Sequence, residues 1–113
     1  MFDMDKQRRQ ELTQLFETFK REPFPQNSSD DRLSELFAEL AECETYTAGL
    51  IVTVAAGSRV DLQMLQFDED LKRRIETLSH DRDPSVAAEA AGYLRYLTQL
   101  QDLVAVARRC VQS

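Results

Sequence analysis

One short segment of the chain combines residue types that could do acid–base chemistry. Ser79 and His80 are followed by Asp81 and Asp83, and His80 is the only histidine in the sequence. A histidine oriented by a carboxylate can act as a general base, and a neighbouring hydroxyl could be the nucleophile. No glycine-rich loop that would stabilise an oxyanion adjoins the segment. We therefore interpret it as a turn between two helices, with the aspartates as turn and cap residues.

The sequence lacks the patterns of known metal and cofactor sites. Zinc sites use paired cysteines and histidines, whereas this chain has two distant cysteines, Cys43 and Cys110, and one histidine. The Glu-x-x-His pairs of di-iron bundles and the glycine motifs of phosphate and dinucleotide sites do not occur. The sequence predicts no metal ion, no cofactor and no catalytic residue.

Glu44 is the most unusual single residue, because it falls within an apolar stripe. At 100° per residue it projects between Leu40 and Thr47. A carboxylate there must find a partner, raise its pKa or lie where the stripe is open, and Tyr93 or Arg8 could be the partner. Glu44 and Tyr93 could thus form a buried polar site. We favour the other interpretation, a paired or outward-turned carboxylate.

A second candidate site is an acidic stripe. Asp31, Glu35, Glu39 and Glu42 are spaced i, i+4, i+8 and i+11, and Tyr46 lies just beyond them. Like charges at i and i+4 repel each other, and no lysine lies between them. Most such stripes are solvated helix faces. A helix that tolerates this repulsion could hold its charge for a basic partner, so these five residues are the predicted partner-binding residues.

Composition limits the class of protein. The 113 residues carry a net charge of −6, from 20 acidic and 14 basic side chains. An acidic body repels nucleic acid and anionic membranes. The start of the chain has no apolar core typical of a secretory signal, and the longest weakly polar run, 48–57, is far shorter than the roughly 20 residues of a membrane helix. We expect a cytoplasmic protein that binds neither nucleic acid nor membrane.

The elements that must position these residues are helices. Only three glycines and three prolines interrupt the chain, which is rich in helix-forming residues. Ser28 occupies a capping-box position, Gly57 is a natural helix stop, Asp61 can cap, and Asp83–Pro84 is a strong helix start. We predict one all-α domain over residues 1–113, a small antiparallel bundle of four helices at about 4–21, 29–56, 61–79 and 84–112.

Apolar side chains follow a helical period in each predicted segment. The first helix is expected to bury Leu12, Leu15, Phe16 and Phe19, the second Leu33, Leu36, Phe37, Leu40, Thr47, Ile51 and Val54, the third Val60, Met64, Phe67, Leu71, Ile75 and Leu78, and the fourth a heptad seam of Val86, Ala90, Tyr93, Leu97, Leu100, Val104, Ala107 and Val111. Leu62, Leu65, Leu94, Leu103 and Val106 fall off these stripes. A second copy of the chain could cover them, so a homodimer is a further hypothesis.

Residues 71–97, LKRRIETLSHDRDPSVAAEAAGYLRYL, resemble one HEAT-type helical hairpin. Leu71 and Ile75 lie on its first helix, DRDP forms the turn, and Val86 and Ala90 lie on the second helix. The segment departs from the pattern at Ala87, where an arginine usually follows the valine. It covers roughly a quarter of the chain, and no second copy follows, whereas solenoids stack several repeats. The resemblance implies an interaction surface rather than an enzyme.

Together these features favour a small acidic helical module that binds another protein. An inhibitor, an immunity-type antidote or an adaptor for a basic partner fits, because opposite charge speeds association. The alternative is a ligand-binding or enzymatic bundle built around Glu44 and Tyr93, with or without His80. Glu44→Gln and His80→Ala separate the two, since a site loses activity without losing its fold.

Overall fold

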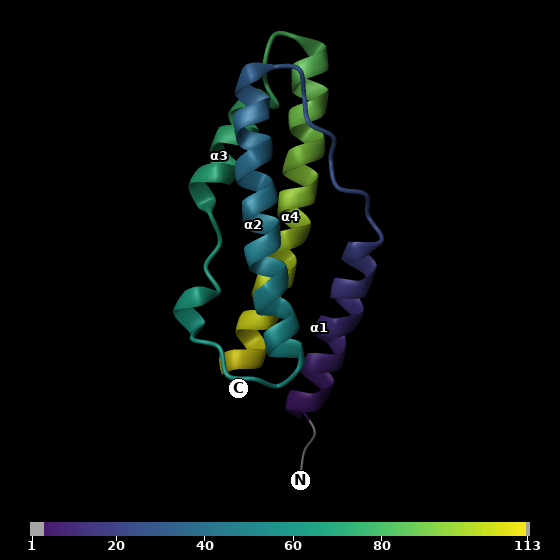
Figure 1. Ribbon diagram of the computed structural model, residues 1–113, viewed down its shortest axis with the longest axis vertical. Helices are drawn as coiled ribbons and strands as arrows, with labels where there is room; N and C mark the ends of the chain where they lie inside the picture. Colours follow the sequence, from purple (N-terminus) through teal and green to yellow (C-terminus); the bar gives the residue numbers. More distant parts are fainter. Residues whose placement is uncertain (1–3, 113) are drawn as a thin grey trace.

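The computed structural model describes residues 4–112, in which four α-helices account for most of the chain and no strand occurs. The helices are α1 (Met4–Lys20), α2 (Asp31–Ala55), α3 (Glu69–Leu78) and α4 (Pro84–Gln112), with a 3-10 turn, η1 (Leu62–Met64), between α2 and α3. Consecutive helices run in opposite directions along the long axis (Figure 1). The predicted all-α bundle of four helices is confirmed.

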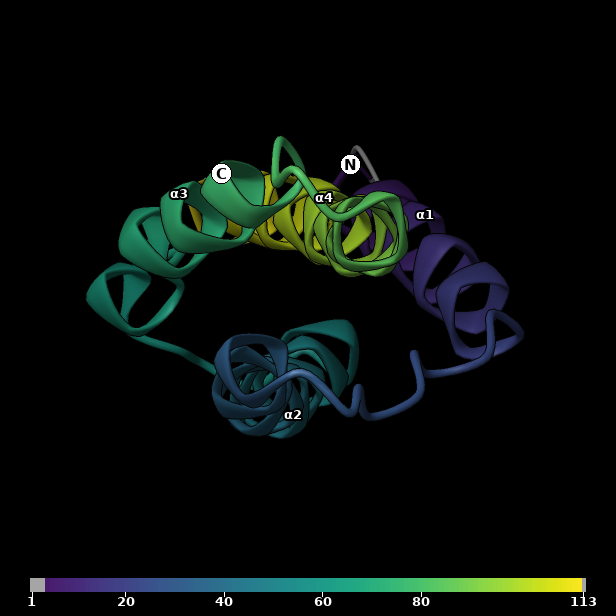
Figure 2. The same cartoon turned by 90° about the horizontal axis from the view of Figure 1, so that it is seen from above.

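The helices form two layers. Seen from above, α3, α4 and α1 lie side by side in a curved layer, and α2 lies alone against its concave face (Figure 2). The molecule measures 56 × 26 × 19 Å. Within this arrangement α4 packs against each of the other three helices. The side of α4 that faces away from α2 is left without a covering helix.

The start and seam of α4 agree with the sequence prediction. The Asp83 carboxylate accepts a hydrogen bond from the Ser85 amide at 2.9 Å, and Pro84 takes the first helical position, where no amide hydrogen is needed. The seam residues from Val86 to Ala107 are buried, and Val111 is partly buried. The helix is about 43 Å long at 1.5 Å per residue. It is the central element of the core.

The ends of α2 show one corrected cap and one confirmed stop. Asp30, not Ser28, caps the helix, and its carboxylate accepts the amides of Arg32 and Leu33. At the other end Gly57 has φ +85, and its amide donates to the Val54 carbonyl at 3.0 Å. A left-handed glycine that redirects the chain in this way closes many helices. The apolar β-branched run near the end of α2 is helical, as its period predicted.

The predicted helix at 61–79 is wrong over its first half. Asp61 caps only η1, the chain is then irregular, and α3 begins at Glu69. Asp68 explains the late start, because its carboxylate accepts the Leu71 amide at 2.9 Å and satisfies the first turn. As a result Met64, predicted to be buried, is 45% exposed, and Leu65 is buried in its place. The Arg108 guanidinium donates to the Leu65 carbonyl at 2.9 Å and ties this irregular segment to α4.

Several other apolar predictions change in the folded chain. Leu12 and Phe19 of α1 are buried, but Leu15 is 40% exposed, because it lines an open depression between α1 and α4. Leu103 and Val106, which fell off the predicted stripes, are buried within the single chain. A second copy is therefore not needed to cover them.

The linker between α1 and α2 contributes one anchor to the core. The Phe24 ring lies 5.3 Å from Phe37 and 5.1 Å from Tyr96, both nearly edge to face. Such arrangements are favourable for aromatic pairs. The anchored ring holds an extended linker, which contains two prolines, against the three-helix layer and α2.

Candidate interaction surface

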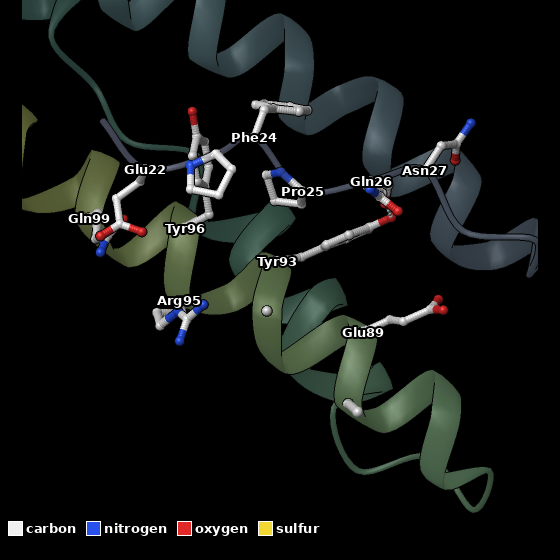
Figure 3. A pocket seen from close by; sticks show the side chains of 13 residues that line it. Glu22, Phe24, Pro25, Gln26, Asn27, Glu89, Tyr93, Arg95, Tyr96 and Gln99 are labelled. Atoms are coloured by element: carbon white, nitrogen blue, oxygen red, sulfur yellow. Dashed lines mark hydrogen bonds between the residues drawn. The ribbon is translucent and has the colours of Figure 1, made fainter. Parts of the chain in front are cut away.

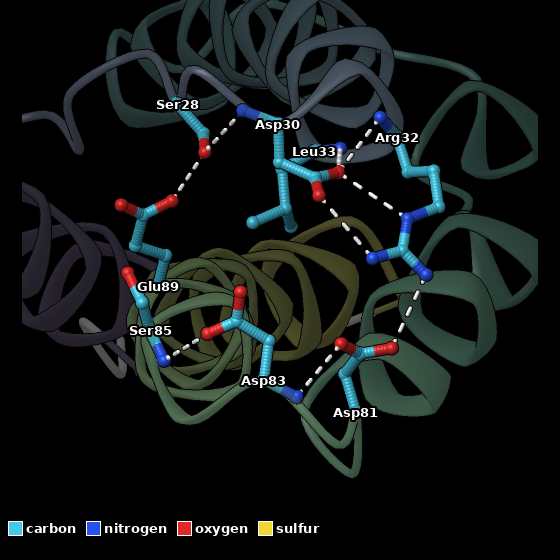
Figure 4. A network of polar contacts seen from close by, with 8 residues as sticks. All are labelled: Ser28, Asp30, Arg32, Leu33, Asp81, Asp83, Ser85 and Glu89. Carbon is cyan, nitrogen blue, oxygen red and sulfur yellow. Dashed lines mark hydrogen bonds and ion pairs between the residues drawn. The ribbon is translucent and has the colours of Figure 1, made fainter.

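The segment around His80 is a structural corner. Its carboxylates bind backbone and an arginine: Asp81 accepts the Asp83 amide at 3.1 Å and pairs with Arg32 at 3.1 Å (Figure 4). Asp83 is occupied by the cap of α4. The His80 side chain is exposed, and no described carboxylate binds it. The turn interpretation made from the sequence agrees with these contacts.

This corner joins the start of α2 to the α3–α4 turn. Arg32 bridges Asp30 at 3.2 Å and Asp81 at 3.1 Å (Figure 4). On the other side the Ser28 hydroxyl accepts the Asp30 amide and donates to Glu89 of α4. The hydrogen bond from the Arg32 guanidinium lowers the pKa of Asp30, and the Asp83 amide together with Arg32 lowers the pKa of Asp81. These carboxylates therefore take part in contacts that join the start of α2 to the α3–α4 turn at this end of the bundle.

The predicted acidic stripe lies on the outer side of α2, and three of its acids keep their charge free. Asp31, Glu35 and Glu42 are exposed, and none of them bonds or pairs with another described residue. Glu39 differs, because both of its oxygens accept from Arg74 of α3, at 2.6 and 2.7 Å. The stripe is therefore interrupted at Glu39 by a cation.

Arg74 is shared between two carboxylates. It binds Glu39 in a bidentate fashion and also Asp70 of its own helix at 3.0 Å. The Glu39 hydrogen bonds raise the pKa of the Arg74 guanidinium, so the cation is firmly held. Because Arg74 lies 35 residues from Glu39, the local spacing of acids on α2 gave no sign of this contact. It fixes the orientation of α3 against α2.

The outer face of α2 continues beyond the acids into an apolar part that the sequence prediction reached only at Tyr46. Tyr46 and Val52 are each 54% exposed, which makes them the two most exposed large apolar side chains among the described residues. Gly49 lies between them, and a Cβ added there would meet no atom within 4 Å. A glycine inside a helix costs about 1 kcal/mol relative to alanine, and packing within this chain does not require it. A glycine inside a predicted helix, flanked by two apolar residues, was the sequence feature that could have identified this part of the surface.

Glu44 and Tyr93, the alternative site, are not brought into contact. The Tyr93 side chain is 2% exposed and its hydroxyl donates to the Gln26 carbonyl at 2.9 Å. Glu44 is half-buried at the edge of the stripe, where the Thr45 hydroxyl donates to it at 3.5 Å. Its charge lies close enough to Tyr96 to add to the effect of burial in raising the pKa of that phenol. Glu44 and Tyr93 therefore interact with different neighbouring residues.

A surface groove of about 440 Å³ runs between the linker and α4 (Figure 3). Pro25 of the linker lies close to Tyr93 of α4, and Glu89 and Arg95 extend from the same helix (Figure 3). Gly92 also lines the groove. Glu44 does not line it. The Tyr93 hydroxyl is already bound to the linker backbone, so it offers no free donor to a ligand.

The remaining candidates are the thiols and possible metal ligands. Cys43 is half-buried, and burial raises the pKa of its thiol, which lowers its reactivity. Cys110 is also half-buried. Among the residues that the structure describes, no group of three or more His, Cys, Asp or Glu side chains is placed to hold a metal ion.

No helix within residues 4–112 has the length and apolar character needed to cross a membrane. No family model, no curated protein and no solved structure matches this chain.

Proposed function

We propose that this chain binds another protein, docking the outer face of α2 on a basic surface as an inhibitor, an immunity-type antidote or an adaptor does. The observation that carries the proposal is the set of three exposed carboxylates, Asp31, Glu35 and Glu42, that no described cation neutralises. Asp31 is in the first turn of α2, where the helix dipole favours an acid, but it repels Glu35 one turn away. Neither Glu35 nor Glu42 pairs with a described residue, so neither contributes an ion pair to the fold.

The charge on this face is suited to attracting a cationic partner. Arg32 is shared by Asp30 and Asp81, and Arg74 is held by Glu39 and Asp70, so neither arginine cancels the three exposed acids. Asp31 and Glu35 are about 6 Å apart along the helix axis, within the roughly 8 Å screening length of physiological salt, and Glu42 lies about 10 Å further along. A partner that covers this face therefore meets all three charges. Such a field raises the rate of association and makes it sensitive to salt.

The apolar end of the same face could supply the close packing contacts that charge alone does not provide. Tyr46 and Val52 flank the bare backbone of Gly49, so a partner side chain could approach the helix closely there. Interfaces commonly combine a small apolar centre, in which tyrosine is enriched, with a polar rim. From Asp31 to Val52 the face spans about 32 Å, at 1.5 Å per residue. The proposed surface thus contains both an attracting region and an anchoring region.

The test compares capture by two variants of equal charge. The tagged chain, the variant Asp31→Asn/Glu35→Gln/Glu42→Gln, and the control Glu11→Gln/Glu17→Gln/Glu76→Gln are each incubated with an extract of the source cell. The control removes three exposed acids from α1 and α3, so both variants have the same net charge. Bound proteins are quantified by mass spectrometry.

We expect one basic protein to bind the native chain and the control in stoichiometric amount. Its recovery with the α2 variant should fall about tenfold or more, and high salt should release it from the native chain. Equal loss with both variants would show that only net charge matters, and unchanged capture by the α2 variant would remove α2 from the interface. Either result contradicts the proposal.

A further inference from the structure

The outer side of α4 carries a second ordered face, distinct from the surface on α2. Seven exposed residues follow one another at alternating intervals of three and four, the spacing of a coiled-coil seam. At 100° per residue they lie on the side of α4 opposite its buried seam. Among residues 4–112 no helix covers the side of α4 that faces away from α2 (Figure 2). The seven residues are Ala88, Ala91, Arg95, Thr98, Asp102, Ala105 and Arg109.

The order of charge on this face is self-complementary. Arg95 and Asp102 are seven residues apart, on either side of Thr98, and neither bonds or pairs with any described residue. If a second α4 lies antiparallel across a twofold axis between Thr98 and Gln99, Arg95 faces Asp102 of the partner subunit, and the symmetry repeats the pair. A parallel arrangement would instead place arginine against arginine and aspartate against aspartate, which is repulsive. The charges therefore select the antiparallel orientation.

The side chains between the charges are compatible with the same arrangement. The twofold axis that pairs Arg95 with Asp102 of the partner subunit brings Ala91 to within about one residue, roughly 1.5 Å along the axis, of the level of Ala105 of the partner subunit. These residues are small and exposed, so they allow two helix axes to approach without displacing any side chain. The contact from Ala88 to Arg109 would be about 32 Å long.

We infer that two copies of this chain associate through the outer faces of α4, antiparallel, with reciprocal Arg95–Asp102 ion pairs. A twofold contact of this kind is closed, so association stops at the dimer. One helix pair buries less than the roughly 1,200 Å² of a standard stable interface, so the dimer is expected to be weak and to form at high protein concentration. Because α2 lies on the other side of the layer, both α2 faces remain exposed and point away from each other (Figure 2). The dimer would present two copies of the surface described above, but its formation does not depend on that surface having a partner.

The test uses charge reversal and its rescue by mixing. Sedimentation equilibrium is measured from about 10 µM to about 1 mM for the native chain, Arg95→Glu, Asp102→Arg and an equimolar mixture of the two variants. Each single reversal creates two like-charge contacts in a homodimer. A mixed dimer of the two variants pairs Glu with Arg at one contact and Asp with Arg at the other. Glu76→Arg, at an exposed position of α3, has the same net charge as Asp102→Arg and is its control.

We expect the native chain and the Glu76→Arg control to dimerise at the upper concentrations. Each single reversal should weaken dimerisation about tenfold or more, and the mixture should restore it. Circular dichroism verifies that each variant is folded, which is expected because both side chains are exposed and neither bonds or pairs with a described residue. A native chain that stays monomeric at the highest concentration, a dimer that tolerates both reversals, or a mixture that fails to recover would each overturn the inference.

Discussion

At the scale of single residues, the acids of this chain divide into those that hold the fold and those that face solvent. Asp30, Asp81 and Glu39 each bind an arginine, and their loss would release elements from one another. Asp31 and Glu35 belong to the same helix as Glu39 but bind no described residue. Residues of one type on one helix face therefore have opposite expected effects on stability.

Two single substitutions on α2 test this division. Glu39→Gln removes the bidentate contact with Arg74 and should lower the melting temperature by about 2–4 °C, as expected for a partly exposed ion pair. Glu35→Gln relieves repulsion with Asp31 and Glu39, and it should leave the melting temperature unchanged or slightly higher. Differential scanning calorimetry of both variants measures the contrast. A loss of equal size at both positions would mean that the Arg74 contact contributes nothing specific.

Tyr96 gives the chain a predictable response to alkaline pH. Burial against Phe19 and Phe24, with the Glu44 charge as the smaller cause, raises its pKa to about 12. Above the unfolded pKa of about 10 the unfolded chain releases the phenolic proton while the folded chain retains it, so stability falls as pH rises between about 10 and 12. Tyr96→Phe removes this group. Urea unfolding from about pH 8 to about pH 12 should show a shallower alkaline loss for the variant, and identical slopes would contradict the assignment.

At the scale of elements, caps decide where the helices begin. The short α3 depends on the Asp68 carboxylate at its first turn, and the irregular segment before it is held by the contact between Arg108 and the Leu65 carbonyl. The apolar period alone would have continued the helix back to Asp61. Local hydrogen bonding to a side chain offers the backbone an alternative to a continuous helix.

Asp68→Ala tests this helix start by the sign of its effect. If residue 68 caps α3, the substitution should lower the free energy of unfolding by about 1 kcal/mol. If residues 61–79 formed one helix, the same substitution would place the best helix-forming residue in its interior and would stabilise the protein. Urea denaturation monitored by circular dichroism distinguishes the two signs, and Asp68→Asn, which keeps a capping oxygen, should retain most of the stability.

The sequence was sufficient for the long elements and insufficient for contacts between them. The seam of α4 and the stripe of α2 extend over many turns, so periodicity identified both helices and most of their buried side chains. The prediction for 61–79 failed because Met64 and Phe67 continue the helical period of Leu71 back along the chain, although Asp68 was a visible cap. For the candidate surface, the sequence revealed the spacing of the acids on α2. It did not reveal that Glu39 binds Arg74, because that contact depends on tertiary packing between residues 35 positions apart.

At the scale of the whole molecule, the two layers separate two exposed faces. The outer face of α2 carries unpaired acids and the exposed Tyr46, and the outer face of α4 carries the self-complementary charges. The two helices lie in different layers (Figure 2). The groove along the linker borders the α4 face, because Ala88 and Arg95 line it together with Tyr93. A partner that docks by charge on α2 should therefore leave the groove and the α4 face unperturbed.

The most direct test is to map the captured partner on the isotope-labelled chain by NMR. We predict that the largest chemical-shift changes on adding this partner occur at exposed α2 positions from Asp31 to Val52, and that they diminish as salt is raised. The largest changes at Gly92, Tyr93 and the linker 22–27, persisting at high salt, would contradict the account and assign recognition to the groove.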